Sequence, residues 1–366
     1  MPESNRLIDL VDERLGRFLE TRESILLSIA PEVGQLASFS RQFLSGGKRF
    51  RALFCYWGYR AVHDARTPEE PDRLGPVIGT ASALELFHAA ALVHDDIIDS
   101  SDTRRGAPSA HRRFEALHRE NAWEGSPEGF GTGAAVLLGD LLLGFSDDLL
   151  AESLADEVPS DRARGVRREF GRMRAEVIAG QYLDILEERS WRTGPEDELL
   201  PRAERVIVYK SAKYSVQAPL VLGALLAGAT LGQLDSLREF GLPLGIAFQL
   251  RDDMLGVFGD AEVTGKPSGD DLREGKRTVL IALARKTLPA SARRVIDELL
   301  GDPELDDAQI RMLQSTITAS GATAEVERMI DLNVHRANRA LDDAALSDAA
   351  VNRLRDLTRS VSQRVA

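Results

Sequence analysis

The sequence has little cysteine, few aromatic residues and a charge balance that disfavours nucleic-acid binding. Its single cysteine, Cys55, excludes an intramolecular disulfide and a zinc site built from cysteines, and it favours a reducing compartment. Lys and Arg number 46 against 58 Asp and Glu, so the net charge is −12, whereas nucleic-acid binders are usually basic. P-loop, dinucleotide-fingerprint, nucleophile-elbow and zinc-protease motifs are absent.

Long apolar runs and export signals are also missing. The longest weakly polar run, residues 218–231, is too short to span a membrane and contains Pro219. The N-terminus has neither the basic nor the apolar segment of a secretory signal. We therefore predict a cytoplasmic protein with no transmembrane segment and no nucleic-acid partner.

Hydrophobic periodicity is helical almost throughout the 366 residues. From Leu7 to Ile29, apolar residues recur every three or four positions, as on one face of a helix. The same pattern occupies residues 50–63, 76–100, 134–155, 162–188, 203–230, 233–257, 277–287, 291–300, 307–319, 322–345 and 347–362. Strand patterns are lacking, and glycine-rich residues 124–133 read as a surface loop. We predict an all-α fold, one domain over residues 1–366, built as a bundle of roughly a dozen helices.

The segment His94-Asp95-Asp96-Ile97-Ile98-Asp99 ends an apolar helical run. On a helix, Asp99 shares a face with Asp95 and Asp96, and neighbouring carboxylates repel one another unless a cation offsets the charge. Hard ions such as Mg²⁺ prefer carboxylate oxygens and complete their coordination with water and substrate phosphates. The segment therefore predicts a magnesium site, and its alternative is a solvated acidic helix end.

A second acidic pair, Asp252-Asp253, also ends an apolar helical run. Two such pairs could face each other across a cavity, since helical proteins build metal sites in bundle cores. Basic residues are dispersed between and around the pairs: Lys48, Arg49, Arg51, Arg104, Arg105, Lys210, Lys213, Lys266 and Lys276. Together these charges suit polyanionic substrates bridged by metal, for example two diphosphates with about three Mg²⁺.

Five stretches, in this order, resemble the trans-prenyl diphosphate synthase family, which includes farnesyl and geranylgeranyl diphosphate synthases. They are residues 46–51, 85–106, 180–184, 210–212 and 248–277. The resemblance implies a prenyltransferase that joins isopentenyl diphosphate to an allylic diphosphate, head to tail. It also implies a polyprenyl synthetase domain with a deep central cavity, both acidic motifs at its mouth, and a homodimer.

The resemblance further implies a role for each matching residue. The metal ligands would be Asp95, Asp96, Asp99, Asp252 and Asp253. The allylic diphosphate would be held by Arg104, Lys210 and Lys266. Isopentenyl diphosphate would be held by Lys48, Arg51, His88 and Arg105. The carbocation pocket would be lined by Gln181, Asp184, Lys210, Ser211 and Gln249, with Lys276 closing over the site. The catalytic group would comprise Asp95, Asp99, Arg104, Lys210, Ser211, Gln249 and Asp252.

The length of the product depends on residues before Asp95 on the same helix. Ala90 and Ala91 are small, whereas Phe87 is large enough to form the floor of the cavity. A twenty-carbon product, geranylgeranyl diphosphate, follows if Phe87 is the floor. If Phe87 instead packs in the core, the cavity extends to longer chains.

Two positions depart from the family pattern. Gly256 stands where the second acidic motif usually ends in a third aspartate, and Ser211 replaces the commoner threonine. The alternatives are a farnesyl or longer-chain synthase, a terpene cyclase and a partner subunit without catalysis. A cyclase has no need of residues 46–51 or Arg105, and a partner subunit has no need of an intact first motif.

Overall fold

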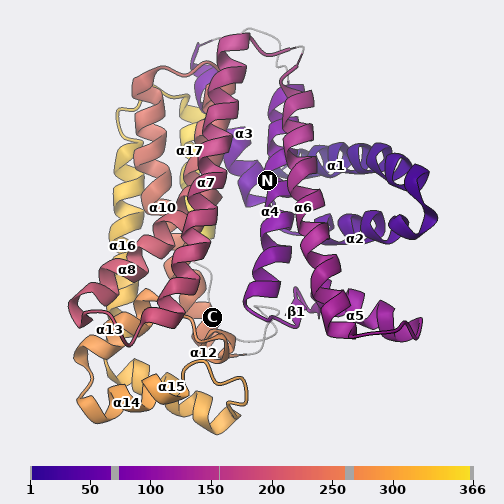
Figure 1. The fold of residues 1–366 in the computed structure, drawn as a ribbon. Helices are drawn as coiled ribbons and strands as arrows, with labels where there is room; N and C mark the ends of the chain where they lie inside the picture. Colours follow the sequence, from indigo (N-terminus) through magenta and orange to yellow (C-terminus); the bar gives the residue numbers. More distant parts are fainter. Residues whose placement is uncertain (1, 67–73, 156, 260–267, 363–366) are drawn as a thin grey trace. The chain divides into compact units, whose positions relative to one another are not determined.

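The computed structural model describes residues 2–66, 74–155, 157–259 and 268–362, and it is all-α over these ranges (Figure 1). Apart from helices and loops, the described residues contain two short strands, β1 (Thr103–Arg104) and β2 (Ala107–Pro108), which pair antiparallel. The prediction of an all-α fold is confirmed. The contacts group the chain into two compact units, residues 1–168 with 219–229 and residues 169–218 with 230–366.

The first unit is built around one apolar helix. Its elements are α1 (Pro2–Ile29), η1 (Pro31–Val33), α2 (Gly34–Leu44), α3 (Phe50–Arg66), α4 (Leu74–Ile98), β1, β2, α5 (Ala110–Glu120), α6 (Pro127–Ser153), the start of α7 (Ser160–Ser190) and most of α9 (Ala218–Leu226). Helix α4 packs against α1, α3, α5 and α6. Among the described helices, α4 alone is long and apolar enough to cross a membrane, but 78% of that stretch is buried inside the protein. A helix surrounded by core is apolar on every side, which accounts for its composition.

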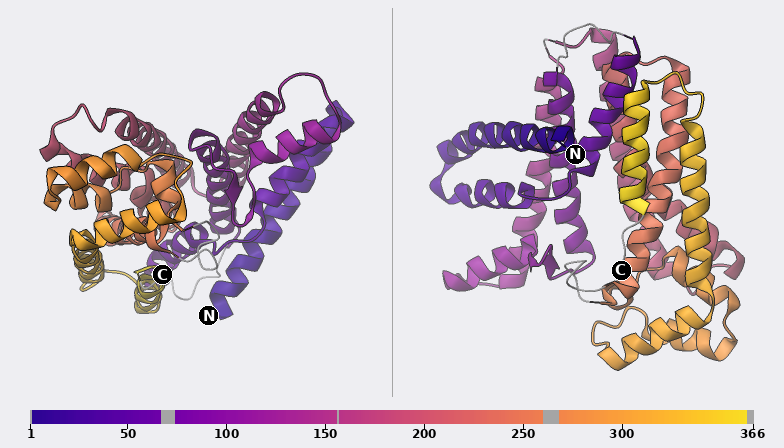
Figure 2. Two further views of the ribbon diagram at one scale, coloured as in Figure 1. Left: turned by 90° about the horizontal axis from the view of Figure 1, so that it is seen from below. Right: turned by 180° about the vertical axis from the view of Figure 1, so that it is seen from behind.

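The second unit carries the rest of α7 and the C-terminal helices. They are η2 (Glu196–Glu198), α8 (Leu199–Val206), η3 (Ile207–Gln217), α10 (Leu231–Phe258), α12 (Asp270–Glu274), α13 (Val279–Thr287), α14 (Ala290–Leu299), α15 (Asp307–Ala319), α16 (Ala322–Ala340) and α17 (Asp348–Ser362). Helices α10, α16 and α17 run side by side (Figures 1 and 2). The unit has its own hydrophobic core, which includes Trp191, Leu250 and Ile281.

Two of the predicted boundaries are wrong. Residues 124–133 do not form a loop throughout, because α6 begins at Pro127. The Ser126 side chain accepts a hydrogen bond from the Gly129 N–H, and proline suits the first helical turn, so local capping outweighs the glycines. Residues 203–230, predicted as one helix, divide into α8, η3 and α9, and η3 is an eleven-residue π-helix.

Candidate active site

The first acidic motif ends α4 and continues into its last turn, where the Asp99 N–H donates to the Asp95 carbonyl at 2.8 Å. Asp96 is fully buried, and Arg104 Nε donates to its Oδ1 at 2.8 Å. Arg104 also lies 3.6 Å from Asp95 Oδ2. The motif therefore separates into two parts: Asp96 holds Arg104 in place, and Asp95 and Asp99 stay partly accessible.

The residues of this motif fit Mg²⁺ held together with a substrate. Asp95 and Asp99 are four residues apart on one helical face and offer hard oxygen donors. Within the described ranges, no group of three or more His, Cys, Asp or Glu side chains forms a metal cage by itself. Mg²⁺ typically binds through one or two carboxylates, water and substrate phosphates, so an open pair of carboxylates is the expected donor set. We therefore propose Asp95 and Asp99 as ligands, and Asp96 as the residue that orients Arg104.

In the same unit, three residues predicted from separate segments, Arg51, His88 and Arg105, lie close together. Burial, and then the charges of Arg51, Arg105 and Arg104, hold the pKa of His88 well below its ordinary value. The Arg105 guanidinium covers Gly47, where a Cβ would lie 3.2 Å from Nη2, and its Nη1 donates to the Ser45 carbonyl at 3.4 Å. Arg51 and Arg105 thus form one cationic surface around His88, suited to an anion that carries no metal bridge.

The neighbouring Arg49, grouped by sequence with the basic residues that suit polyanionic substrates, is instead paired with acidic side chains of the fold. Its guanidinium is buried and donates to Glu85 Oε2 at 3.1 Å and to Asp12 Oδ1 at 2.7 Å. Glu85 is also buried, and its Oε1 accepts the Ala52 N–H at 3.4 Å. This ion pair joins the start of α3 to α4 and so positions Arg51 beside His88. Three positive charges within residues 48–51 give no sign that the middle one, Arg49, points inward.

Substitution Glu85→Ala should lower the free energy of unfolding by about 3–5 kcal/mol, because it leaves the Arg49 charge buried and unpaired. Urea unfolding followed by circular dichroism measures the change. The matched control is Glu13→Ala, which removes an exposed helical ion pair with Arg17 and should cost less than about 1 kcal/mol. Equal losses in the two variants would contradict the structural role of Glu85.

In the second unit, Asp184 lies between two predicted lysines. Lys210 Nζ donates to Asp184 Oδ2 at 2.5 Å, and Lys276 Nζ lies 3.5 Å from the same oxygen. Lys276 also donates to Glu188 Oε1 at 3.3 Å, and burial raises the pKa of Glu188. The structure therefore brings Asp184, Lys210 and Lys276 together in a network of alternating charge.

The second acidic motif joins this network. Gln249 Nε2 donates to Asp253 Oδ1 at 2.7 Å. Burial raises the pKa of Asp253 to about 7, with further contributions from the charges of Asp252 and Asp184. A carboxyl group in such surroundings favours a nearby cation. Asp252 is more accessible than Asp253, so we propose Asp252 as the ligand and Asp253 as its support.

The space beside Gly256 is occupied by a carboxylate from another helix. A Cβ at this position would overlap the Asp271 side chain, with Oδ1 at 2.7 Å. Asp271 lies on α12, and its backbone carbonyl accepts the N–H groups of Gly275 and Lys276. A carboxylate from α12 therefore lies where the side chain of residue 256 would extend, and a larger residue at this position would have to displace it.

Restoring an aspartate by Gly256→Asp should lower activity and stability. The new side chain would displace Asp271 and place two negative charges together, and overpacking of this kind costs about 1–3 kcal/mol. Thermal unfolding and steady-state rates of Gly256→Asp and Gly256→Ala measure the effect, with a smaller loss expected for alanine. A more active and equally stable Gly256→Asp protein would refute this explanation.

The remaining predicted site residues differ in burial and in the unit to which they belong. Gln181 and Ser211 are partly buried in the second unit, and the Gln181 Nε2 atom is buried without a hydrogen bond within the described residues. Lys48 is exposed. On α4, Phe87 and Ala90 are buried and Ala91 is partly accessible. Lys266 lies outside the described residues.

A partly open pocket of about 410 Å³ lies in the second unit, between α8, η3, α10, α13 and α16. Its lining includes Ile207, Leu250 and Met329. Among the described residues, none of the predicted site residues lines it.

Comparisons with known proteins agree with these features. The polyprenyl synthetase family model matches residues 34–317. The crystal structure of a geranylgeranyl pyrophosphate synthase from Corynebacterium glutamicum, complexed with isoprenyl diphosphate and magnesium, is 39% identical, with a TM-score of 0.92 over 98% of this chain and 99% of that chain. A geranylfarnesyl diphosphate synthase from Aeropyrum pernix is 30% identical over 332 residues, 90% of this chain and 94% of that protein. A geranylgeranyl diphosphate synthase from Mycobacterium tuberculosis is 30% identical over 303 residues, 83% of this chain and 77% of that protein.

Proposed function

Since the chain belongs to the polyprenyl synthetase family and is a prenyltransferase, we propose that it joins isopentenyl diphosphate to an allylic diphosphate to make geranylgeranyl diphosphate. The observation that carries the proposal is the presence of two separate sets of charged and polar side chains in the first unit, each suited to one diphosphate. Asp95, Asp99 and Arg104 form one, and the cluster around His88 forms the other. A terpene cyclase binds one diphosphate and has no use for the second set. A subunit without catalysis has no use for either.

In this proposal each set holds one substrate. Arg104, fixed by Asp96, and Lys210 grip the allylic diphosphate, whereas Arg51, His88 and Arg105 hold isopentenyl diphosphate. The allylic C–O bond breaks, the double bond of isopentenyl diphosphate forms the new C–C bond, and a proton leaves the adjacent carbon. The released diphosphate accepts that proton. Ser211 and Gln249 supply neutral polar groups, which stabilise a developing carbocation without trapping it.

The acidic side chains supply the ligands for the metal. We propose that Asp95, Asp99 and Asp252 bind about three Mg²⁺, which neutralise the charge of the leaving diphosphate when bound. The magnesium in the Corynebacterium glutamicum relative supports this choice of ion. The match of the family model to residues of both units also supports a single polyprenyl synthetase domain over residues 1–366.

A product assay tests the proposed function. Purified protein, Mg²⁺ and labelled isopentenyl diphosphate are combined with dimethylallyl, geranyl or farnesyl diphosphate, and the dephosphorylated alcohols are sized. The expected product is a single twenty-carbon alcohol. A ladder of longer alcohols would retain the reaction and reject the chain length, and the absence of elongation with every primer would reject the reaction.

Phe87 is proposed to stop chain growth, since its large side chain is buried on α4 two turns before Asp95. Substitution Phe87→Ala should lengthen the main product beyond twenty carbons in the same assay. Phe54→Ala, a buried aromatic truncation on α3, is the matched control and should reduce stability without lengthening the product. An unchanged product from Phe87→Ala would mean that Phe87 serves only the core.

We also propose a homodimer. Along α7, Ile178, Tyr182 and Leu186 recur every four residues and are 61%, 64% and 38% exposed. On α6, Leu137 is 62% exposed. Large exposed apolar side chains of this kind mark protein interfaces. Light scattering should give twice the chain mass, and Leu137→Glu with Tyr182→Glu should give the monomer.

A further inference from the structure

The segment that carries Lys210 and Ser211 has an unusual backbone. It belongs to the π-helix η3, which ends with the Ala218 N–H donating to the Lys213 carbonyl, five residues back. Such wide turns are rare, and isolated ones cluster at functional sites because they redirect side chains. An eleven-residue π-helix has weaker internal support than an α-helix, so its neighbours must hold its geometry.

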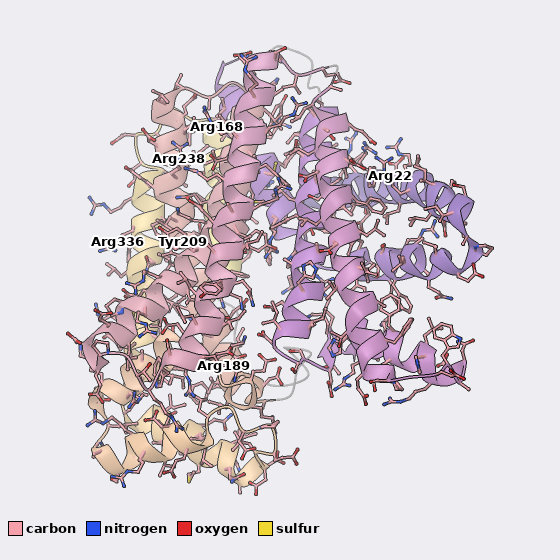
Figure 3. All side chains as sticks on the ribbon, in the orientation of Figure 1. Arg22, Arg168, Arg189, Tyr209, Arg238 and Arg336 are labelled. Carbon is pink, nitrogen blue, oxygen red and sulfur yellow. The ribbon has the colours of Figure 1, made fainter. Side chains whose placement is uncertain are left out.

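On one side, η3 lies directly against the backbone of α7. A Cβ on Gly180 would lie 2.5 Å from the Tyr209 carbonyl carbon and 2.7 Å from the Lys210 Cα. These are backbone atoms, which cannot move aside as a side chain can. Tyr209 is labelled in Figure 3, and Lys213 Nζ lies over its ring at 4.6 Å.

The residues one turn before and after Gly180 bind η3 through its lysines. Glu176 Oε1 accepts from Lys213 Nζ at 2.8 Å, and Asp184 Oδ2 accepts from Lys210 Nζ at 2.5 Å. Glu176, Gly180 and Asp184 are spaced by four and share one helical face. Glycine in the middle of this face brings the two carboxylates within reach of the two lysines.

On the other side, α10 approaches η3 in the same way. A Cβ on Gly245 would lie 2.5 Å from the Ala212 carbonyl oxygen and 2.7 Å from the Ala212 Cα. Gln249 and Asp253 follow Gly245 at intervals of four residues, and they hydrogen bond to each other at 2.7 Å. The backbone of residues 209–212 is therefore in close contact with two helices, at a glycine in each case.

We propose that Gly180 and Gly245 are positioning residues for the reaction: their missing side chains let α7 and α10 hold η3 so that Lys210 and Ser211 keep their catalytic orientation. The inference rests on the proposed function, since Lys210 and Ser211 are its binding and catalytic groups. It assigns no contact with substrate to either glycine.

The test compares glycine-to-alanine substitutions at matched positions. Gly180→Ala and Gly245→Ala should each lower kcat by about 100-fold, the loss expected when a catalytic group moves by about 1 Å. The controls are Gly171→Ala on α7 and Gly232→Ala on α10, because a Cβ at either position would meet nothing within 4 Å. Both controls should keep kcat within about twofold, since nothing has to move.

A second measurement separates positioning from general damage. Gly180→Ala is repeated in a Lys210→Met background and Gly245→Ala in a Ser211→Ala background, where each should now cost less than about threefold. Three outcomes would each overturn the inference. The glycine variants could lose as much activity in the mutant backgrounds as in the wild type, they could keep full activity, or both could be unfolded by circular dichroism while the control variants fold. An inactive parent protein with inactive controls would instead reject the proposed function.

Discussion

Substitution Asp95→Ala is expected to lower kcat by about 1,000-fold in the presence of saturating substrates and Mg²⁺. Asp95 is one of the two partly accessible carboxylates of the first motif, lying 3.6 Å from Arg104 and four residues before the other, Asp99. Its removal takes away a ligand for the ion that neutralises the leaving diphosphate. We therefore expect a fall in kcat at the upper end of the range measured when one charge-stabilising group is removed from an enzyme. Asp99→Ala should behave alike.

The matched control is Asp102→Ala in the same unit. Asp102 pairs with Arg112 at 2.7 Å, and its side chain is 65% exposed, so its loss should change the rate less than about fivefold. Initial rates as a function of Mg²⁺ concentration distinguish the two positions, because only Asp95→Ala should need more metal for half-maximal activity. Similar rates for the Asp95→Ala and Asp102→Ala proteins would exclude Asp95 as a ligand.

Substitution Lys210→Met should lower kcat/KM for the allylic substrate by about 100- to 1,000-fold. The lysine contributes a mobile positive charge that binds diphosphate. Of the two lysines beside Asp184, its loss leaves only Lys276, which lies 3.5 Å from the carboxylate. Methionine retains most of the volume of the side chain, so packing around η3 changes little. Steady-state kinetics with the allylic substrate varied measure the effect.

Lys213→Met provides the closest comparison for Lys210→Met. Lys213 lies three residues later on η3, pairs with Glu176 at 2.8 Å, and has the same 21% side-chain exposure as Lys210. Its loss removes an ion pair but no proposed contact with substrate, and it should cost less than about fivefold. If both variants lost activity equally, the effect would belong to η3 as a whole and not to Lys210.

The sequence predicts which site residues lie close together where they belong to one short segment of the chain. Asp95 and Asp99 lie together because helical spacing places them there, and His88 shares their helix two turns earlier. The clustering of Arg51 and Arg105 with His88 was predicted from the family resemblance, and the pKa of His88 reflects their proximity. Helix boundaries were less reliable, because Ser126 and Pro127 begin α6 inside a stretch whose glycines indicated a loop.

The sequence by itself determined the all-α fold, the acidic motifs and the family, since helical period and residue type are local properties of the chain. Only the tertiary structure decided which charges serve the fold: Arg49 is buried against Glu85, and Asp96 against Arg104. It also decided that Asp271 fills the space at Gly256, and that glycines let two helices approach Lys210 and Ala212. These outcomes depend on which segments meet in space and how closely their backbones pack, and helical periodicity constrains neither.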